Sequence, residues 1–216
     1  MKNIYIILAC FTLSILACKN DGGHNEKVTS DTTAIVIDTM KLDSINPGMK
    51  RFEMEKGIMN MLMFSSDQIL QKRTIYFDRF GARLVIVDER GLYIYQMNGF
   101  EYHINPRDKH IVKEQLRYEN HYDPLMLNAM LMSDEVKKEI NWTADGEEEI
   151  LGHKCQKYKC HELKLNFTTE VWLYKGFPLL VKNQDPAKNV TIIECKKMQE
   201  NVAVNPAKFV IPKLDK

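Results

Sequence analysis

The chain contains 216 residues, of which 44% are hydrophobic and 27% are charged. This composition is typical of a soluble globular protein and argues against a disordered or membrane-spanning one. The 30 Lys and Arg residues nearly balance the 29 Asp and Glu residues, so no basic surface indicates nucleic acid as a partner.

The N-terminus has the features of a secretion signal. Lys2 precedes residues 4–17, an uncharged and mostly apolar run of fourteen residues, whereas a membrane-spanning helix needs about 20. The run ends in Leu16-Ala17-Cys18, which resembles a bacterial lipobox: an aliphatic residue, a small residue and the cysteine that receives the lipid. The resemblance implies that residues 1–17 are a signal peptide and that the sulfur of Cys18 carries the lipid anchor.

Residues 18–49 are predicted to connect this anchor to a domain. Lys19-Asn20-Asp21 resembles the signal that follows the lipidated cysteine of surface-exported Gram-negative lipoproteins, although Asn20 stands where an acidic residue is usual. Residues 19–33 are polar and contain two adjacent glycines, which is typical of a flexible tether. Residues 34–40 are either an extra edge strand or part of the tether. We therefore expect an outer membrane lipoprotein, on either the periplasmic or the cell-surface face.

Residues 50–216 are predicted to form a mainly β domain, because short segments rich in β-branched and aromatic residues alternate with turn-forming residues. The predicted strands are residues 52–64, 68–77, 83–88, 92–97, 101–104, 110–114, 149–161, 164–174, 179–183 and 190–198. Asn98-Gly99 predicts a tight hairpin, and Gly57 predicts a bulge in the first strand. The regular spacing predicts an antiparallel meander, curled into a half-barrel or an incomplete barrel.

A helical region is predicted to interrupt the strands. Asp123-Pro124 combines an N-cap residue with proline at the first helical position. Residues 125–132 are then apolar at every position except Asn128, and residues 134–142 form a second, amphipathic piece. A helix that is apolar on all sides must be enclosed. The first piece is therefore predicted to be a short, Met-rich lid or plug on the concave face of the sheet.

Methionine residues are concentrated in the same two places. Met59, Met61 and Met63 alternate along the first strand, so they share one face. The unbranched thioether adapts to irregular space, as in promiscuous apolar cavities. Ordinary core packing and a ligand cavity both remain open as interpretations. The candidate cavity residues are Met59, Met61, Met63, Leu125, Met126, Met130 and Leu131.

Four segments carry a resemblance to a known fold. They are residues 74–81 (TIYFDRFG), 149–158 (EILGHKCQKY), 171–179 (VWLYKGFPL) and 204–212 (VNPAKFVIP). Together with the order of the elements, they resemble the LolA/LolB-like lipoprotein-carrier fold, and in particular an envelope family of unknown function with that fold. The resemblance implies a half-barrel that shelters acyl chains beneath a helical lid, and so a role in binding a hydrophobic ligand or lipid.

The domain has three cysteines, and the oxidising envelope favours one disulfide. Cys155 and Cys160 are five residues apart on one predicted strand, so they point to opposite faces and are not expected to pair. Cys195 can bridge either of them, and Cys155 is the preferred partner. No C-x-x-C or H-x-x-x-H spacing indicates a metal site. No G-x-S-x-G, H-E-x-x-H or glycine-rich phosphate loop indicates catalysis, so we expect a non-enzyme without cofactor or catalytic residues.

Two functions from different classes remain. In the first, a membrane-anchored envelope lipoprotein binds a lipid or an acyl chain in the cavity of the half-barrel. In the second, the domain is a non-catalytic envelope module for structure or protein interaction, and its interior is a filled core. Exposed aromatic residues would then meet a partner, with Tyr93, Tyr95, Trp172 and Tyr174 as candidates. The sequence identifies no ligand and no protein partner.

Overall fold

The computed structural model describes residues 50–65, 68–116, 123, 125–162 and 166–213. The predictions for residues 1–49, including the signal peptide, Cys18, the tether and the possible strand at residues 34–40, lie outside the described residues. The chain divides into two units, Met1–Ile37 and Asp38–Lys216. The fold described below is that of the second unit.

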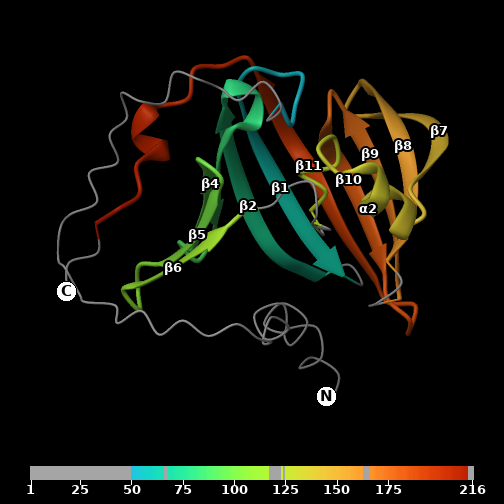
Figure 1. Cartoon of the computed structure of the whole chain (residues 1–216), viewed down its shortest axis with the longest axis horizontal. Coiled ribbons are helices and arrows are strands. Elements are labelled where there is room, and N and C mark those ends of the chain that lie inside the picture. Colours follow the sequence, from blue (N-terminus) through green and yellow to red (C-terminus); the bar gives the residue numbers. More distant parts are fainter. Residues whose placement is uncertain (1–49, 66–67, 117–122, 124, 163–165, 214–216) are drawn as a thin grey trace. The chain divides into compact units, whose positions relative to one another are not determined.

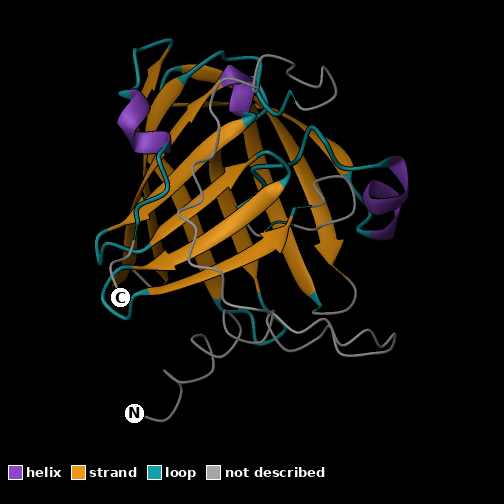
Figure 2. Cartoon of the chain, turned by 60° about the vertical axis from the view of Figure 1, so that its left-hand side comes forward, coloured by secondary structure: helices purple, strands orange, loops and turns teal. Residues whose placement is uncertain are grey.

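Within the described residues, eleven strands form one antiparallel sheet (Figure 1). The strands are β1 (Gly57–Ser65), β2 (Gln68–Asp78), β3 (Arg83–Asp88), β4 (Tyr93–Met97), β5 (Phe100–Asn105), β6 (His110–Gln115), β7 (Thr143–Ile150), β8 (His153–Glu162), β9 (Phe167–Tyr174), β10 (Phe177–Gln184) and β11 (Val190–Glu200). Their order is β6-β5-β4-β3-β2-β1-β11-β10-β9-β8-β7, so β6 and β7 are the edges of a sheet that is not closed. Figure 2 shows how the strands curl around one side. The predicted half-barrel is confirmed.

The predicted strand at residues 149–161 is confirmed only from residue 153 onward. The structure has two strands here, β7 and β8, joined by a turn at Leu151 and Gly152. Both turn residues have positive φ, 53° and 74°, as a two-residue hairpin turn requires. Leu-Gly is not a typical signal for this turn, which is why the sequence concealed it. The Asn98-Gly99 hairpin is confirmed, with φ values of 56° and 76°.

The first strand also differs from its prediction. β1 begins at Gly57 instead of residue 52, and the register shifts of β1 lie at Asn60/Met61 and Met63/Phe64, so the bulge predicted at Gly57 is wrong. A Cβ atom at Gly57 would lie 2.9 Å from the ring of Phe77. Glycine is therefore present because an aromatic ring packs against the backbone at this point.

The Met-rich lid is not a helix. Residues 125–132 form successive turns, in which the Asp123 carboxylate accepts hydrogen bonds from the Leu125 and Leu127 N–H groups at 2.9 and 3.0 Å. Met126 has φ of 56°, and this left-handed conformation interrupts a right-handed helix. We call residues 125–132 the apolar loop. The second predicted piece is confirmed as a shorter helix, α2 (Asp134–Glu139), capped by Ser133.

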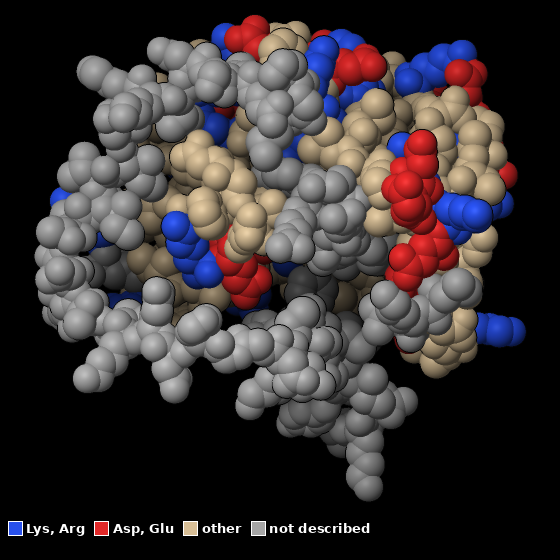
Figure 3. Space-filling model, viewed as in Figure 1, with Lys and Arg blue, Asp and Glu red and all other residues tan. Residues whose placement is uncertain are grey.

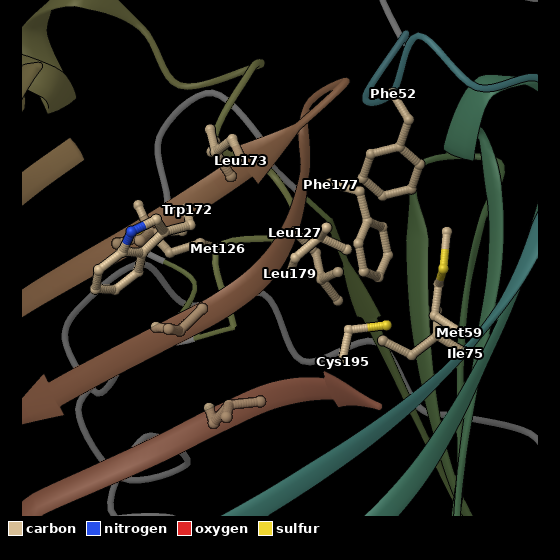
Figure 4. Close-up of a cluster of buried hydrophobic side chains, with 14 of the residues drawn as sticks. Phe52, Met59, Ile75, Met126, Leu127, Trp172, Leu173, Phe177, Leu179 and Cys195 are labelled. Atoms are coloured by element: carbon tan, nitrogen blue, oxygen red, sulfur yellow. The ribbon is translucent and has the colours of Figure 1, made fainter. Parts of the chain in front are cut away.

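The main hydrophobic core lies on the concave face of the sheet. Met59, Ile75 and Ile86 stand opposite one another across β1, β2 and β3, and the apolar loop packs into the same core. Figure 4 shows residues from both halves of the sheet converging here. The rings of Phe52 and Phe177 are 5.1 Å apart, which attaches the segment before β1 to β10.

A second cluster lies on the convex face. Val85, Tyr95 and Tyr102 stand opposite one another on β3, β4 and β5, and alternation directs them away from the concave core. Phe209, in the 3-10 helix η6 (Pro206–Phe209), is buried in this cluster. The Arg83 guanidinium lies 4.6 Å from the centre of its ring. The C-terminal segment, red in Figure 1, therefore covers the convex side of the first strands.

Among the described residues, no helix is long and apolar enough to cross a membrane. Charged side chains of both signs are interspersed over the visible face (Figure 3), in keeping with the balanced composition.

Candidate ligand cavity

A small cavity lies on the concave face between the central strands and the apolar loop. Its lining residues are Met61 and Met63 from β1, Arg73 and Ile75 from β2, Pro178 from β10, Ile193 from β11, and Leu125 and Leu127 from the apolar loop. Its volume is about 10 Å³, which is room for about one water molecule. This cavity therefore has no room for an acyl chain in this structure.

Strand register explains why these residues meet. Met61 pairs with Arg73 on β2, and Met63 pairs with Ile193 on β11. Directly paired residues lie on the same face of a sheet. Side chains from β2 and β11 therefore line the cavity together with the methionines of β1. Leu125 and Leu127 then close the cavity from the side of the apolar loop.

The predicted cavity residues divide into three groups. Met61, Met63 and Leu125 line the cavity. Met59 and Met126 are buried in the surrounding core but do not line it. Met130 and Leu131 were placed in the cavity wrongly.

The absence of a helix explains this error. In the turns of the apolar loop Met130 is 49% exposed and Leu131 is only half-buried. The sequence prediction also omitted Leu127, Arg73, Ile75, Pro178 and Ile193. Alternation along β2 and β11 carries a signal for three of them, but only once the register is known.

Arg73 is the charged member of the lining. Burial lowers its pKa, and the nearby carboxylates of Asp88 and Asp123 oppose that effect. A guanidinium remains protonated through such changes. The cavity is thus an apolar space with a cation in its wall, and that cation is offset by two nearby anions.

Asp88 is held by its own hydrogen bonds. Its carboxylate accepts from the Leu92 N–H at 2.9 Å, from Gln71 Nε2 at 2.8 Å and from Arg90 Nε at 3.0 Å. Burial on its own would raise the pKa of Asp88, but these bonds outweigh it and lower the pKa below its ordinary value. The carboxylate is therefore charged near neutral pH and fixes the environment of Arg73.

A polar chain crosses the concave face farther from the cavity. Arg51 donates to the Gln96 side chain, Gln96 donates to Glu101, and Glu101 contacts the His103 ring. The hydrogen bond with Glu101 raises the pKa of His103, with burial opposing it. Arg51 is almost fully buried, and the Gln96 side chain accepts a hydrogen bond from its Nη1 atom.

The predicted Cys155–Cys195 disulfide is wrong. Both thiols are free and buried, as is that of Cys160. Cys155 is on β8 and Cys195 is on β11, and β9 and β10 lie between them, which exceeds the reach of a disulfide. Burial raises the pKa of Cys160 to about 12 and that of Cys195 to about 11, so these thiols do not supply a thiolate near neutral pH. Within the described ranges, no group of three His, Cys, Asp or Glu residues is placed to hold a metal.

No protein-family model matches the chain, and no curated protein matches it. Among solved structures, a chain of the MucA/MucB complex from Pseudomonas aeruginosa aligns with a TM-score of 0.54 and 11% identity, over 76% of this chain and 58% of that one. An uncharacterised conserved protein from Thermus thermophilus aligns at 0.53 and 8%, over 77% and 93%. The LolA superfamily protein NE2245 from Nitrosomonas europaea aligns at 0.39 and 10%, over 76% and 94%.

The first two alignments, together with the open curled sheet, define the class of this protein as an open antiparallel half-barrel. The curled antiparallel half-barrel expected from the sequence is confirmed. The chain spans a little over half the length of the first of these structures. At these identities the similarity concerns the fold alone.

Proposed function

We propose that this protein is an envelope lipoprotein that binds a hydrophobic ligand, a lipid or an acyl chain, on the concave face of its half-barrel. The observation that carries the proposal is the cavity beneath the apolar loop, in which seven of the eight lining side chains are apolar. Cys18 would anchor the protein in the outer membrane. A tethered protein of this kind receives or holds its ligand at the membrane and does not shuttle it.

Binding must move the apolar loop. Ligand sites commonly enclose about 300–1,000 Å³, and the present cavity is about 10 Å³. Leu125 and Leu127 therefore occupy the place of the ligand in this closed form. Turns and the Asp123 carboxylate, but no strand ladder, hold the apolar loop in position. An acyl chain that replaces these leucines buries apolar surface comparable to the surface the loop gives up.

A second candidate is favoured by the small volume of this cavity. If the apolar loop never leaves, the concave face is a core, and the module acts through its outer surface. The similar MucA/MucB structure is that of a protein complex, which supports a search for a protein partner. In both candidates we propose a non-catalytic role. The described thiols are buried and have raised pKa values, which argues against a cysteine nucleophile.

Native mass spectrometry of the chain produced without residues 1–18 tests the first candidate. The protein is purified without detergent and then incubated with dodecanoate. We expect a copurified lipid, or one added dodecanoate per chain. Absence of both overturns lipid binding, and a single stable protein captured from intact cells would then favour the interaction module.

The lipid anchor is tested separately. Incorporation of radioactive palmitate by the full chain, and its loss in Cys18→Ser, supports the anchor. Equal labelling of both chains refutes it.

A further inference from the structure

Four exposed aliphatic side chains lie at one end of the sheet. They are Ile69 (58% exposed), Leu70 (42%), Ile111 (41%) and Val190 (37%). Each lies close to a turn: β1–β2, β5–β6 or β10–β11. In an antiparallel meander these turns are at the same end, the lower end in Figure 1. We call these four residues the hairpin rim.

Basic side chains surround the hairpin rim. Exposed cations follow β2's first residues or occupy the turns at this end: Lys72, Arg107, Lys109 and Lys188. Arg90 also lies in one of these turns, but it forms an ion pair with the buried Asp88 at 3.0 Å. The acidic residues of the same turns are Glu89, Asp108 and Asp185. Asp108 and Asp185 accept hydrogen bonds from Asn105 and Asn189, which leaves both carboxylates charged. Apart from the Arg90–Asp88 pair, the described turns at this end therefore carry four cations and three anions, a small excess of positive charge beside the aliphatic side chains.

We propose that the hairpin rim rests on the surface of an anionic phospholipid bilayer. Aliphatic side chains that project from turns enter the headgroup layer, while adjacent Lys and Arg side chains reach lipid phosphates. Charge complementarity favours this occupant over a second copy of the chain, since two copies joined by this end would bring like charges together.

The contact would place the candidate cavity near the bilayer. Ile193, in the cavity wall, is three residues from Val190 along β11, a separation of about 10 Å at the rise of a strand. Met63 is likewise close to the end of β1. This consequence rests on the proposed function, whereas the bilayer contact itself does not.

Vesicle cosedimentation tests the contact. The chain without residues 1–18 is suitable, because the sheet and both hydrophobic clusters lie within residues 50–213. We expect binding to vesicles of phosphatidylcholine with phosphatidylglycerol, weaker binding to phosphatidylcholine alone, and release by salt. The double variant Ile69→Ser/Leu70→Ser should bind at least tenfold more weakly. Lys188→Gln should lose roughly fivefold.

The matched control is Leu151→Ser/Val210→Ser, which removes two exposed aliphatic side chains outside the hairpin rim and outside the apolar loop and should leave vesicle binding unchanged. Circular dichroism verifies that each variant is folded. If the wild-type chain ignores anionic vesicles, or if both double variants bind like it, the proposal is overturned. A dimer that Ile69→Ser/Leu70→Ser dissociates would assign the rim to a second copy and overturn it too. Dodecanoate binding by Ile69→Ser/Leu70→Ser tests the cavity separately from the bilayer contact.

Discussion

Truncation of Leu127 tests whether the apolar loop is a displaceable lid or a permanent part of the hydrophobic core. It is buried, and it lines the cavity from the apolar loop. Leu127→Ala removes about 2.4 kcal/mol of burial free energy, at about 0.8 kcal/mol per methylene equivalent, and it enlarges the cavity. With the cavity penalty included, we expect the free energy of unfolding to fall by about 2–5 kcal/mol.

Ligand affinity should change in the opposite direction. If Leu127 must leave the concave face before an acyl chain enters, the variant avoids that cost, and the Kd for dodecanoate falls by up to about 50-fold for 2.4 kcal/mol. Leu84→Ala is the matched control. Leu84 is fully buried in the same core but does not line the cavity, so we expect similar destabilisation without tighter binding.

Urea unfolding and calorimetric titration with dodecanoate measure the two effects on the same samples. Tighter binding by Leu127→Ala alone supports a loop that competes with the ligand. If both variants lose stability and neither binds dodecanoate more tightly than the wild type, Leu127 is ordinary core and the displacement mechanism is refuted.

Further predictions concern the scaffold. Gly81→Ala should destabilise the protein more than Gly91→Ala in urea unfolding: both glycines have positive φ, costing about 1–2 kcal/mol, but only at Gly81 would the new Cβ meet a ring, at 2.8 Å. Equal losses would contradict this. The pKa of Asp88 is lower in the folded state than its value of about 3.9 in the unfolded state. Asp88 therefore stabilises the fold at pH values above about 3.9, and this contribution is lost as the pH falls through the folded-state pKa. Asp88→Asn should flatten the dependence of unfolding free energy on pH between about 5 and 2, and an unchanged slope would exclude Asp88 as its source. Trp172→Phe should cost about 1.5–3 kcal/mol, because Nε1 donates to Glu148 at 2.7 Å. Glu148→Gln should cost less, since the amide oxygen still accepts, whereas Glu148→Ala removes the acceptor. No loss of stability in Glu148→Ala would refute a contribution from this hydrogen bond.

The fold could be predicted well where local chemistry decides it. β3 begins and ends at the predicted residues, and Asn98-Gly99 forms the expected turn. Prediction failed where tertiary contacts decide. The turn at Leu151 and Gly152 has no strong signal, and β7 is a polar edge strand exposed along nearly its whole length, so it lacks the apolar alternation that marks a half-buried strand.

The candidate site was only partly predictable for a related reason. Met61 and Met63 are correctly predicted to share one face of β1. Side chains alternate between the two faces of any strand, whatever its neighbouring strands are. The composition of the apolar loop predicts a helix, but the positive φ at Met126 breaks the helical periodicity and changes which of its residues are buried. Arg73 was missed because only the pairing of β1 with β2 brings it beside Met61.

The electrostatics of the cavity limit what it can recognise. Arg73 is the charged lining residue, yet the carboxylates of Asp88 and Asp123 both act on it. A cation offset by two anions gives little net attraction for an acidic headgroup. Recognition within the cavity therefore depends on apolar contact, which suits an acyl chain but does not select its headgroup. Any preference for anionic lipids must arise elsewhere, and the net basic end around the hairpin rim is where the described residues offer it.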